Sequence, residues 1–262
     1  MRLSRVEAVP WKAFTDWWGD AWEPGDHVAI LGQTHSGKTT LEGGLLAVRN
    51  FVLVLDAKGH DSSLSAFGYA RTSAWPLPNK YKQDIKEGYP CHVIVGRKIM
   101  TEEDFERNAA LLRRVVKDVF GQGKWTLVAD EGQILADTRY VGAGASLEKL
   151  LIVARDRKVS IVFAVQRPSI GRTSPAASAA FSQATWLFAT HTRDQKVQDR
   201  LAEIAGRPAP EFRALLNELP KYTWACFGLD PHEPIRIIQP PKLPDVPDQH
   251  DEESGFAKFI RT

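Results

Sequence analysis

The sequence predicts an α/β fold of three layers, in which helices cover both faces of a mostly parallel central sheet. Short and almost continuously apolar segments recur along the chain, which is typical of parallel strands buried on both faces. Segments with helical spacing of apolar residues separate them, most clearly over residues 102–120. The length of 262 residues suits one large domain with a substantial core. The predicted strands are 27–31, 51–55, 92–95, 125–129, 160–165 and 185–189, with 234–238 as a closing strand.

Composition changes divide the chain into three parts. Residues 1–25 form a leader with four tryptophans, residues 26–240 form the main domain, and residues 241–262 form a Pro-rich, acidic tail. We expect the leader to contain an amphipathic helix packed on the main domain. The alternative is a surface that docks a partner, because exposed tryptophan is costly without one. The leader's tryptophans are Trp11, Trp17, Trp18 and Trp22.

Charge and cysteine content narrow the possible environments. The formal net charge is +2, so contact with nucleic acid would have to come from local basic loops. The chain has two cysteines far apart, which favours a reducing compartment over a disulfide framework. We see neither an apolar run long enough to span a bilayer nor the apolar segment of a secretory signal. We therefore expect a cytoplasmic location without membrane contact, in a host cell if the protein is viral.

A glycine loop between the first main-domain strand and a following helix predicts a nucleotide site. It matches G-x-x-x-x-G-K-[ST], in which backbone N–H groups surround phosphate oxygens. Lys38 is expected to reach the β- and γ-phosphates of ATP, and the Thr39 hydroxyl to bind Mg²⁺. The residues predicted to bind the nucleotide are Gly32, Gln33, Thr34, His35, Ser36, Gly37, Lys38, Thr39 and Thr40.

Two further strands end in residues that would make this site hydrolytic. The strand at 125–129 leads into Asp130 and Glu131. Asp130 is expected to hold Mg²⁺ opposite Thr39, and Glu131 to orient and deprotonate the attacking water. The alternative is a pair of solvated acids that cap the next helix. The strand at 160–165 ends in Gln166, which we expect to sense the γ-phosphate and the water.

These motifs resemble those of the FtsK/HerA group of P-loop ATPases, a RecA-like (ASCE) branch with an extra strand between the Walker A and Walker B strands. The resemblance covers about residues 27–240. Its most specific part is 155–169, where Gln166-Arg167-Pro168-Ser169 resembles a signature of the group. The tetrapeptide Asp56-Ala57-Lys58-Gly59 resembles the Asp-x-Lys-Gly of related DNA-translocating ATPases.

The resemblance implies that Arg155 is a candidate arginine finger, with Arg157 as the next candidate. Such a residue reaches the site of a neighbouring subunit, which implies a homo-oligomeric ring of five or six subunits. The competing interpretation is a surface salt bridge, because residues 155–158 are a mixed-charge cluster.

Two loops are candidates for contact with DNA. Arg139 and Tyr140 lie in the first, at 134–146, and Arg172 lies in the second, at 168–178. We therefore expect an ATP-driven translocase of double-stranded DNA, most specifically a viral genome-packaging ATPase that binds a portal or capsid vertex. A cellular or conjugative translocase is the near alternative. An ATP-switched assembly protein without translocation is the alternative from another class.

Overall fold

The computed structural model describes residues 5–59, 67–166 and 175–241. Every segment predicted to be a strand forms one, with bounds within one residue of the prediction. Three further strands, β1, β4 and β9, were not predicted. The strands are β1 (Val6–Ala8), β2 (Val28–Leu31), β3 (Phe51–Leu55), β4 (Ala70–Thr72), β5 (Cys91–Val95), β6 (Thr126–Ala129), β7 (Ser160–Val165), β8 (Trp186–Thr190), β9 (Trp224–Gly228) and β10 (Ile235–Ile238).

The helices alternate with these strands, as a parallel sheet requires. The predicted helix over 102–120 is α5, whose start is fixed by a capping box between Thr101 and Asp104. The helices are α1 (Trp11–Ala21), α2 (Lys38–Leu46), α4 (Asn79–Glu87), α5 (Glu102–Gln122), α6 (Gly132–Ala136), α7 (Gly144–Val153), α8 (Pro175–Gln183), α9 (Gln195–Ile204) and α10 (Ala209–Glu218), with a 3₁₀ turn η1 (Arg155–Arg157).

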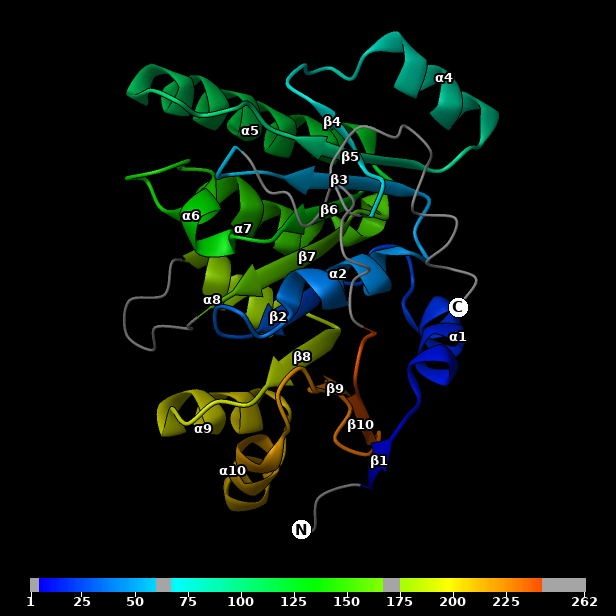
Figure 1. Cartoon of the computed structure of the whole chain (residues 1–262), viewed down its shortest axis with the longest axis vertical. Coiled ribbons are helices and arrows are strands. Elements are labelled where there is room, and N and C mark those ends of the chain that lie inside the picture. Colours follow the sequence, from blue (N-terminus) through cyan, green and yellow to red (C-terminus); the bar gives the residue numbers. More distant parts are fainter. Residues whose placement is uncertain (1–4, 60–66, 167–174, 242–262) are drawn as a thin grey trace.

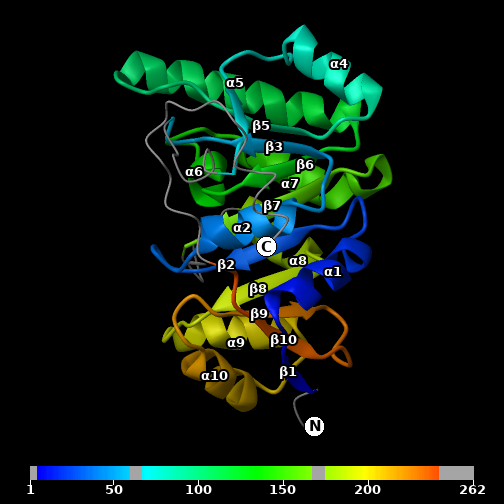
Figure 2. The same cartoon turned by 45° about the vertical axis from the view of Figure 1, so that its right-hand side comes forward.

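Within the described ranges, the strands form one sheet in the order β1-β10-β9-β8-β2-β7-β6-β3-β5-β4. Figure 1 shows this sheet running from β4 at the top to β1 at the bottom, and Figure 2 shows the same arrangement from β5 down to β1. The strands from β8 to β4 are all parallel, whereas β9 is antiparallel to both of its neighbours. The mostly parallel α/β fold is thereby confirmed. Strand β7 lies between β2 and β6, which is where the resemblance places an extra strand.

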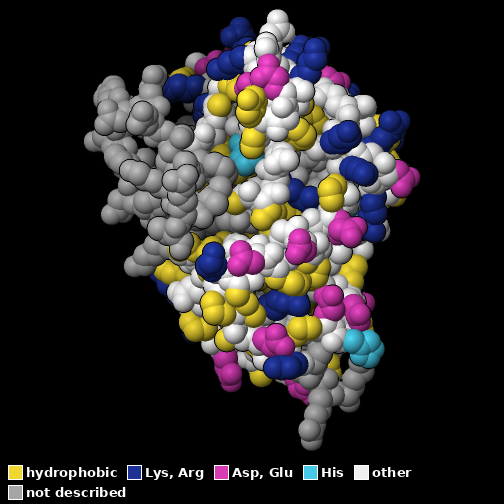
Figure 3. All heavy atoms as spheres, turned by 90° about the vertical axis from the view of Figure 1, so that its right-hand side faces the viewer, with side chains coloured by type: hydrophobic (Ala, Val, Ile, Leu, Met, Phe, Trp, Pro, Cys, Tyr) yellow, Lys and Arg dark blue, Asp and Glu magenta, His cyan; other side chains and the backbone are white. Residues whose placement is uncertain are grey.

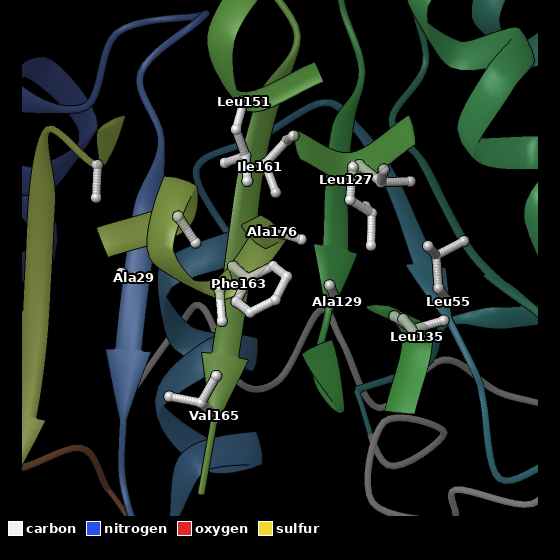
Figure 4. Packing of buried hydrophobic residues seen from close by; sticks show 14 of the residues in the cluster. Ala29, Leu55, Leu127, Ala129, Leu135, Leu151, Ile161, Phe163, Val165 and Ala176 are labelled. Carbon is white, nitrogen blue, oxygen red and sulfur yellow. The ribbon is translucent and has the colours of Figure 1, made fainter. Parts of the chain in front are cut away.

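Helices cover both faces of the sheet, which gives the three predicted layers. On one face, α1 and α2 pack with side chains such as Val28, Ile30 and Val162. On the other face, α5 to α10 bury the alternate side chains of the same strands. Figure 4 shows this second core, where Phe163 of β7 lies beside Ala176 of α8 and Ile161 lies beside Leu151 of α7. Neither face of the central strands is left to water, which explains their continuous apolar sequence.

The tryptophan-rich leader is built into the fold. Its helix α1 buries Phe14 and Trp18 completely, and both rings pack edge-on against Phe188 of β8. The short strand β1 pairs with β10 and extends the sheet. This arrangement corresponds to the amphipathic helix, packed on the main domain, that we expected in the leader. The acidic tail at 242–262 lies outside the described residues, so its proposed docking role stays a prediction.

A membrane span was not expected. In the part of the chain that the structure describes, no helix combines the length and the apolar character needed to cross a bilayer.

Candidate nucleotide site

The glycine loop lies at the carboxyl end of β2, in the strand–loop–helix context that its motif requires. The backbone N–H of Gly32 donates to Val165 O at 3.1 Å, which ties the start of the loop to β7. The loop then turns through His35 and Gly37, whose φ values of 61° and 88° are left-handed. Gly37 directly precedes α2, so the loop ends at the N-terminus of this helix. The first backbone N–H groups of a helix have no hydrogen-bond partner within the helix. The loop is therefore shaped to receive an anion at a helix N-terminus.

Lys38 crosses over this loop. Its side chain is nearly buried, and its Nζ donates to the carbonyl oxygens of Gly32 at 2.9 Å and Gln33 at 3.2 Å. Thr39 and Thr40 follow in the first turn of α2 and are half-buried. The exposed side chains of the loop are those of Gln33, Thr34 and His35.

The ring of Trp224, from the unpredicted strand β9, packs against the start of the loop. A Cβ on Gly32 would lie 2.6 Å from the ring of Trp224 and 2.5 Å from Ser36 Oγ. Trp224 is the first residue of β9 and is fully buried. Glycine is the residue that fits at position 32, because any side chain there would collide with this ring.

The second motif lies two strands away, at the end of β6. Neighbouring strands are about 4.8 Å apart, so β6 and β2 are separated by roughly 10 Å with β7 between them. Asp130 is 8% exposed, and the side chain of Glu131 is 15% exposed. The solvated-acid alternative would require these acids to cap the next helix. Glu131 directly precedes α6, but its side chain makes no capping hydrogen bond to that helix.

The donor set here fits Mg²⁺. Thr39 and Asp130 would offer one hydroxyl and one carboxylate oxygen, and Mg²⁺ in phosphate sites takes few protein ligands and keeps several waters. The described residues contain no cluster of three or more His, Cys, Asp or Glu side chains that could hold a metal ion by themselves. The remaining ligands would come from phosphate oxygens and water.

Gln166 connects the two motifs. Its Oε1 accepts a hydrogen bond from Thr34 Oγ1 at 2.9 Å, and its Nε2 donates to the two oxygens of Glu131 at 3.0 and 3.2 Å. One amide side chain therefore bridges the glycine loop and the acidic residue predicted to be the base. The sequence placed Gln166 between the motifs but did not identify Thr34 as its partner.

A second polar group reaches Glu131 from the end of β3. Lys58 Nζ contacts Glu131 Oε1 as an ion pair. The loop that carries Lys58 is held by Asp56, whose Oδ1 accepts from the backbone N–H of Lys58 at 3.0 Å and of Gly59 at 2.8 Å. Asp56 also forms an ion pair with Arg71 of β4. The Asp-x-Lys-Gly tetrapeptide was the sequence signal for this loop, but not for its contact with Glu131.

A cavity of about 230 Å³ opens beside this site. It lies between the start of the glycine loop and the N-terminus of α9, and Gln166 contributes to its wall. The sequence analysis did not predict it. Its lining residues are Leu31, Gly32, Gln33, Gln166, Thr190, His191, Thr192, Asp194 and Val197.

Arg155 lies at the opposite edge of the sheet. It precedes β7 in the turn η1, whereas Gln166 follows β7, and the six residues of that strand span about 16 Å. Its guanidinium is exposed and makes long hydrogen bonds to Thr185 Oγ1 at 3.3 Å and Gln183 O at 3.4 Å. No ion pair involves Arg155 among the described residues. The length of β7 leaves Arg155 too far from the nucleotide loop of its own chain to act there.

Behind Arg155, the amino-terminal edge contains a buried histidine. His27 Nε2 contacts Leu151 O at 3.1 Å, and His27 Nδ1 accepts from the backbone N–H of Ile161 at 3.1 Å. Burial, and then the positive charge of Arg155, lower the pKa of His27 to about 4. His27 is therefore a neutral link between α7 and two strands. Figure 3 looks onto this side of the molecule, where basic and acidic side chains are interspersed.

The predicted DNA contacts are only partly described. Arg139 and Tyr140 lie in the exposed turn between α6 and α7, at the same edge as the nucleotide loop. The Arg139 guanidinium forms an ion pair with Asp137 at 2.6 Å, so a contact with phosphate would have to replace that pair. Arg172 lies outside the described residues.

Comparison with known proteins identifies the fold. No family model matches the chain, and no curated protein matches it by sequence. The genome-packaging NTPase B204 from Sulfolobus turreted icosahedral virus 2, in complex with ATP-gammaS, matches with a TM-score of 0.50 and 17% identity over 84% of this chain and 99% of that chain. The DNA-packaging ATPase B204 from Sulfolobus turreted icosahedral virus gives 0.52 and 16% over 84% and 100%.

A secretion ATPase has the same fold. The cytoplasmic domain of the type VII secretion ATPase EccC from Thermomonospora curvata matches with a TM-score of 0.53 and 15% identity, over 91% of this chain and 28% of that chain. Identities this low establish the fold alone. The chain therefore has the fold of these viral packaging ATPases and of this secretion ATPase, which agrees with the ATPase fold that its motifs predicted.

Proposed function

We propose that this protein binds ATP with Mg²⁺ at residues 32–40 and hydrolyses it. The observation that carries the proposal is the bridge through Gln166, which joins Thr34 of the phosphate loop to Glu131. The bridge holds the Glu131 carboxylate at a defined position relative to the phosphate loop. A water above this pair would lie between the base and the γ-phosphate.

The residues have distinct parts in this reaction. The N–H groups of the loop and Lys38 bind the β- and γ-phosphates. Glu131 takes a proton from water, whose oxygen attacks the γ-phosphorus while the bond from that phosphorus to the β,γ-bridging oxygen breaks. ADP and inorganic phosphate leave. Bound by Thr39 and Asp130, Mg²⁺ would neutralise charge on the phosphate oxygens.

We further propose that the protein is a ring motor of five or six subunits that translocates double-stranded DNA, most specifically for genome packaging. Two observations support this. The viral packaging ATPases share the fold over nearly their whole length. In addition, Arg155 is exposed at the edge of the sheet opposite the nucleotide loop, where it is available to a neighbouring subunit. A portal or capsid vertex would then be the partner, and the host cytoplasm the location.

The fold by itself does not fix the cargo, because a secretion ATPase shares it. The deciding experiment measures phosphate release by the assembled protein with and without duplex DNA, with Glu131→Gln as the inactive control. Oligomer mass is determined in the same buffer by light scattering. The proposal expects a pentamer or hexamer whose turnover rises with DNA of any sequence and falls steeply with salt, because phosphate contacts release counterions.

A different result would favour an alternative. Turnover in an assembled ring that saturating duplex DNA leaves unchanged would contradict the DNA motor. It would favour an ATP-switched assembly protein or a motor for protein substrates. Absence of ATP binding by the wild-type protein would contradict the proposal as a whole.

A further inference from the structure

A tight turn between α10 and β9 lies against the nucleotide loop. The turn at 220–223 is closed by a hydrogen bond from Thr223 N to Pro220 O at 3.2 Å. Thr190 Oγ1 donates to Thr223 O at 2.9 Å, which fixes the turn to the end of β8. Within it, Tyr222 has a φ of 65°, a left-handed conformation that costs free energy for a residue with a bulky side chain.

The strained tyrosine lies beside the second glycine of the loop, Gly37. A Cβ on Gly37 would lie 3.3 Å from Tyr222 Cδ1. Two residues further along, Trp224 packs under Gly32. The segment that contains both rings therefore packs against the glycine loop at both ends of its motif, at Gly32 and at Gly37.

The two rings differ in what they expose. Trp224 is fully buried and provides the packing beneath the loop. Tyr222 is 40% exposed although it is held in place by its neighbours. Lys221 Nζ lies 4.7 Å from the centre of the Tyr222 ring. Part of the Tyr222 ring is therefore open to a ligand, and backbone strain of this kind clusters at ligand sites.

The position of Tyr222 fits one end of a nucleotide. Glu131 and Gln166 follow β6 and β7, on one side of β2, and they mark where the γ-phosphate lies. Tyr222 precedes β9, on the other side of β2 beyond β8. A nucleotide with its phosphates in the loop and its γ-phosphate toward Glu131 must extend its nucleoside away from β6. That direction leads toward the β8–β9 side, where Tyr222 is exposed.

We propose that Tyr222 forms a stacking platform for the purine base of the bound nucleotide. This deepens the proposed function and rests on it. The aromatic face supplies dispersion and π contacts that every purine offers, and the strained turn keeps the ring at a fixed position beside Gly37. The phosphate loop would bind the charged end, and Tyr222 would bind the base.

The test compares a nucleotide with a ligand that lacks the base. Affinities for ATPγS and for inorganic tripolyphosphate, both with Mg²⁺, are measured by calorimetry on the full chain. The main variant is Tyr222→Gly, because glycine adopts a φ of 65° without strain and the turn is preserved. Tyr222→Phe keeps the aromatic ring. Tyr89→Ala is the matched control, since Tyr89 is 61% exposed and lies in the turn before β5.

We expect Tyr222→Gly to raise the Kd for ATPγS about tenfold, the effect of losing one base–aromatic stack. Its Kd for tripolyphosphate should stay unchanged, and Tyr222→Phe and Tyr89→Ala should bind both ligands like the wild type. An unchanged Kd for ATPγS, or an equal loss for both ligands, would overturn the platform while leaving the proposed ATPase intact. Failure of the wild type to bind either ligand would overturn both proposals.

Discussion

The two edges of the sheet differ in how their polar residues are held. At the carboxyl edge, Thr34, Gln166, Glu131 and Lys58 form a chain of contacts at hydrogen-bonding distance within one subunit. At the amino edge, Arg155 makes two long contacts and is exposed. One edge therefore holds a connected set of polar side chains, whereas the other presents an arginine that forms no ion pair with the residues that the structure describes. In the ring that we propose, the reaction centre would be assembled from these two edges of neighbouring subunits.

The largest effect is expected at the carboxyl edge, from Glu131→Gln. The variant keeps the size of the side chain but cannot accept the proton of water, so turnover should fall about 10⁴-fold. Affinity for ATPγS should be retained, because the phosphate loop is untouched. Phosphate release and equilibrium binding measure the two quantities. Turnover near that of the wild type would remove Glu131 from the role of base.

Arg155→Ala should have the next largest effect although the residue lies far from the nucleotide loop of its own chain. Loss of an arginine finger lowers turnover by about 10³-fold and leaves nucleotide binding largely intact. Arg157→Ala, three positions from the sheet on the same turn, is the matched control and should retain most activity. A reversed order of the two variants would assign the finger to Arg157.

Gln166→Ala should lower turnover about 10²-fold, the typical loss when one positioned hydrogen-bond donor is removed from a reacting group. Thr34→Val removes only the hydroxyl that donates to Gln166 and should have a smaller effect in the same direction. Single-turnover hydrolysis measures both. Equal and normal rates would show that the bridge is structural and has no part in the reaction.

At the amino edge, His27 should make the free energy of unfolding depend on pH. Its pKa is about 4 in the folded protein and about 6.5 when unfolded, so the unfolded chain binds the proton first as pH falls. The contribution of His27 to the free energy of unfolding should therefore be fully present above about pH 7. The free energy of unfolding should fall by about 2 kcal/mol between about pH 7.5 and 5. Urea denaturation at each pH measures it.

The control for this prediction is His27→Gln, which should flatten the dependence on pH. Burial also lowers the pKa of His92, which contributes in the same direction and remains in the variant. A slope that His27→Gln leaves unchanged would contradict the assignment of the effect to the amino edge.

The smallest effect on turnover is expected from Lys58→Ala. Lys58 forms its ion pair with Glu131 from a side chain that is 46% exposed, so we expect a loss of about tenfold through poorer positioning of the carboxylate. A dependence of the defect on salt concentration would support an electrostatic contact. Activity equal to that of the wild type would show that the contact is incidental.

The sequence predicted the regular parts of the fold because their chemistry is local. Buried strands such as Phe51–Leu55 and Ser160–Val165 are continuous apolar runs, and their observed bounds agree with the prediction. The short edge strands β1 and β4 were missed because three residues carry no periodicity. Strand β9 was missed although its run 224–228 is largely apolar.

The site could be predicted only where its residues follow motifs. Glu131 and Gln166 each end a predicted strand, so their shared edge followed from the parallel sheet. The contacts of Lys58 and Tyr222 depend on how segments more than 70 and 180 residues from their partners come together. Such contacts are set by tertiary packing, which a single sequence does not encode in any local pattern.

We propose that one active site uses the carboxyl edge of one subunit and Arg155 of the next. Arg155→Ala and Glu131→Gln proteins are mixed in equal amounts under conditions that exchange subunits, and phosphate release is compared with each variant alone. If Arg155 acts in trans, about a quarter of the sites in mixed rings pair an intact Glu131 with an intact Arg155, and turnover should recover to about that fraction of the wild type. Turnover no higher than that of the two inactive variants, in rings shown by mass to be mixed, would contradict the claim.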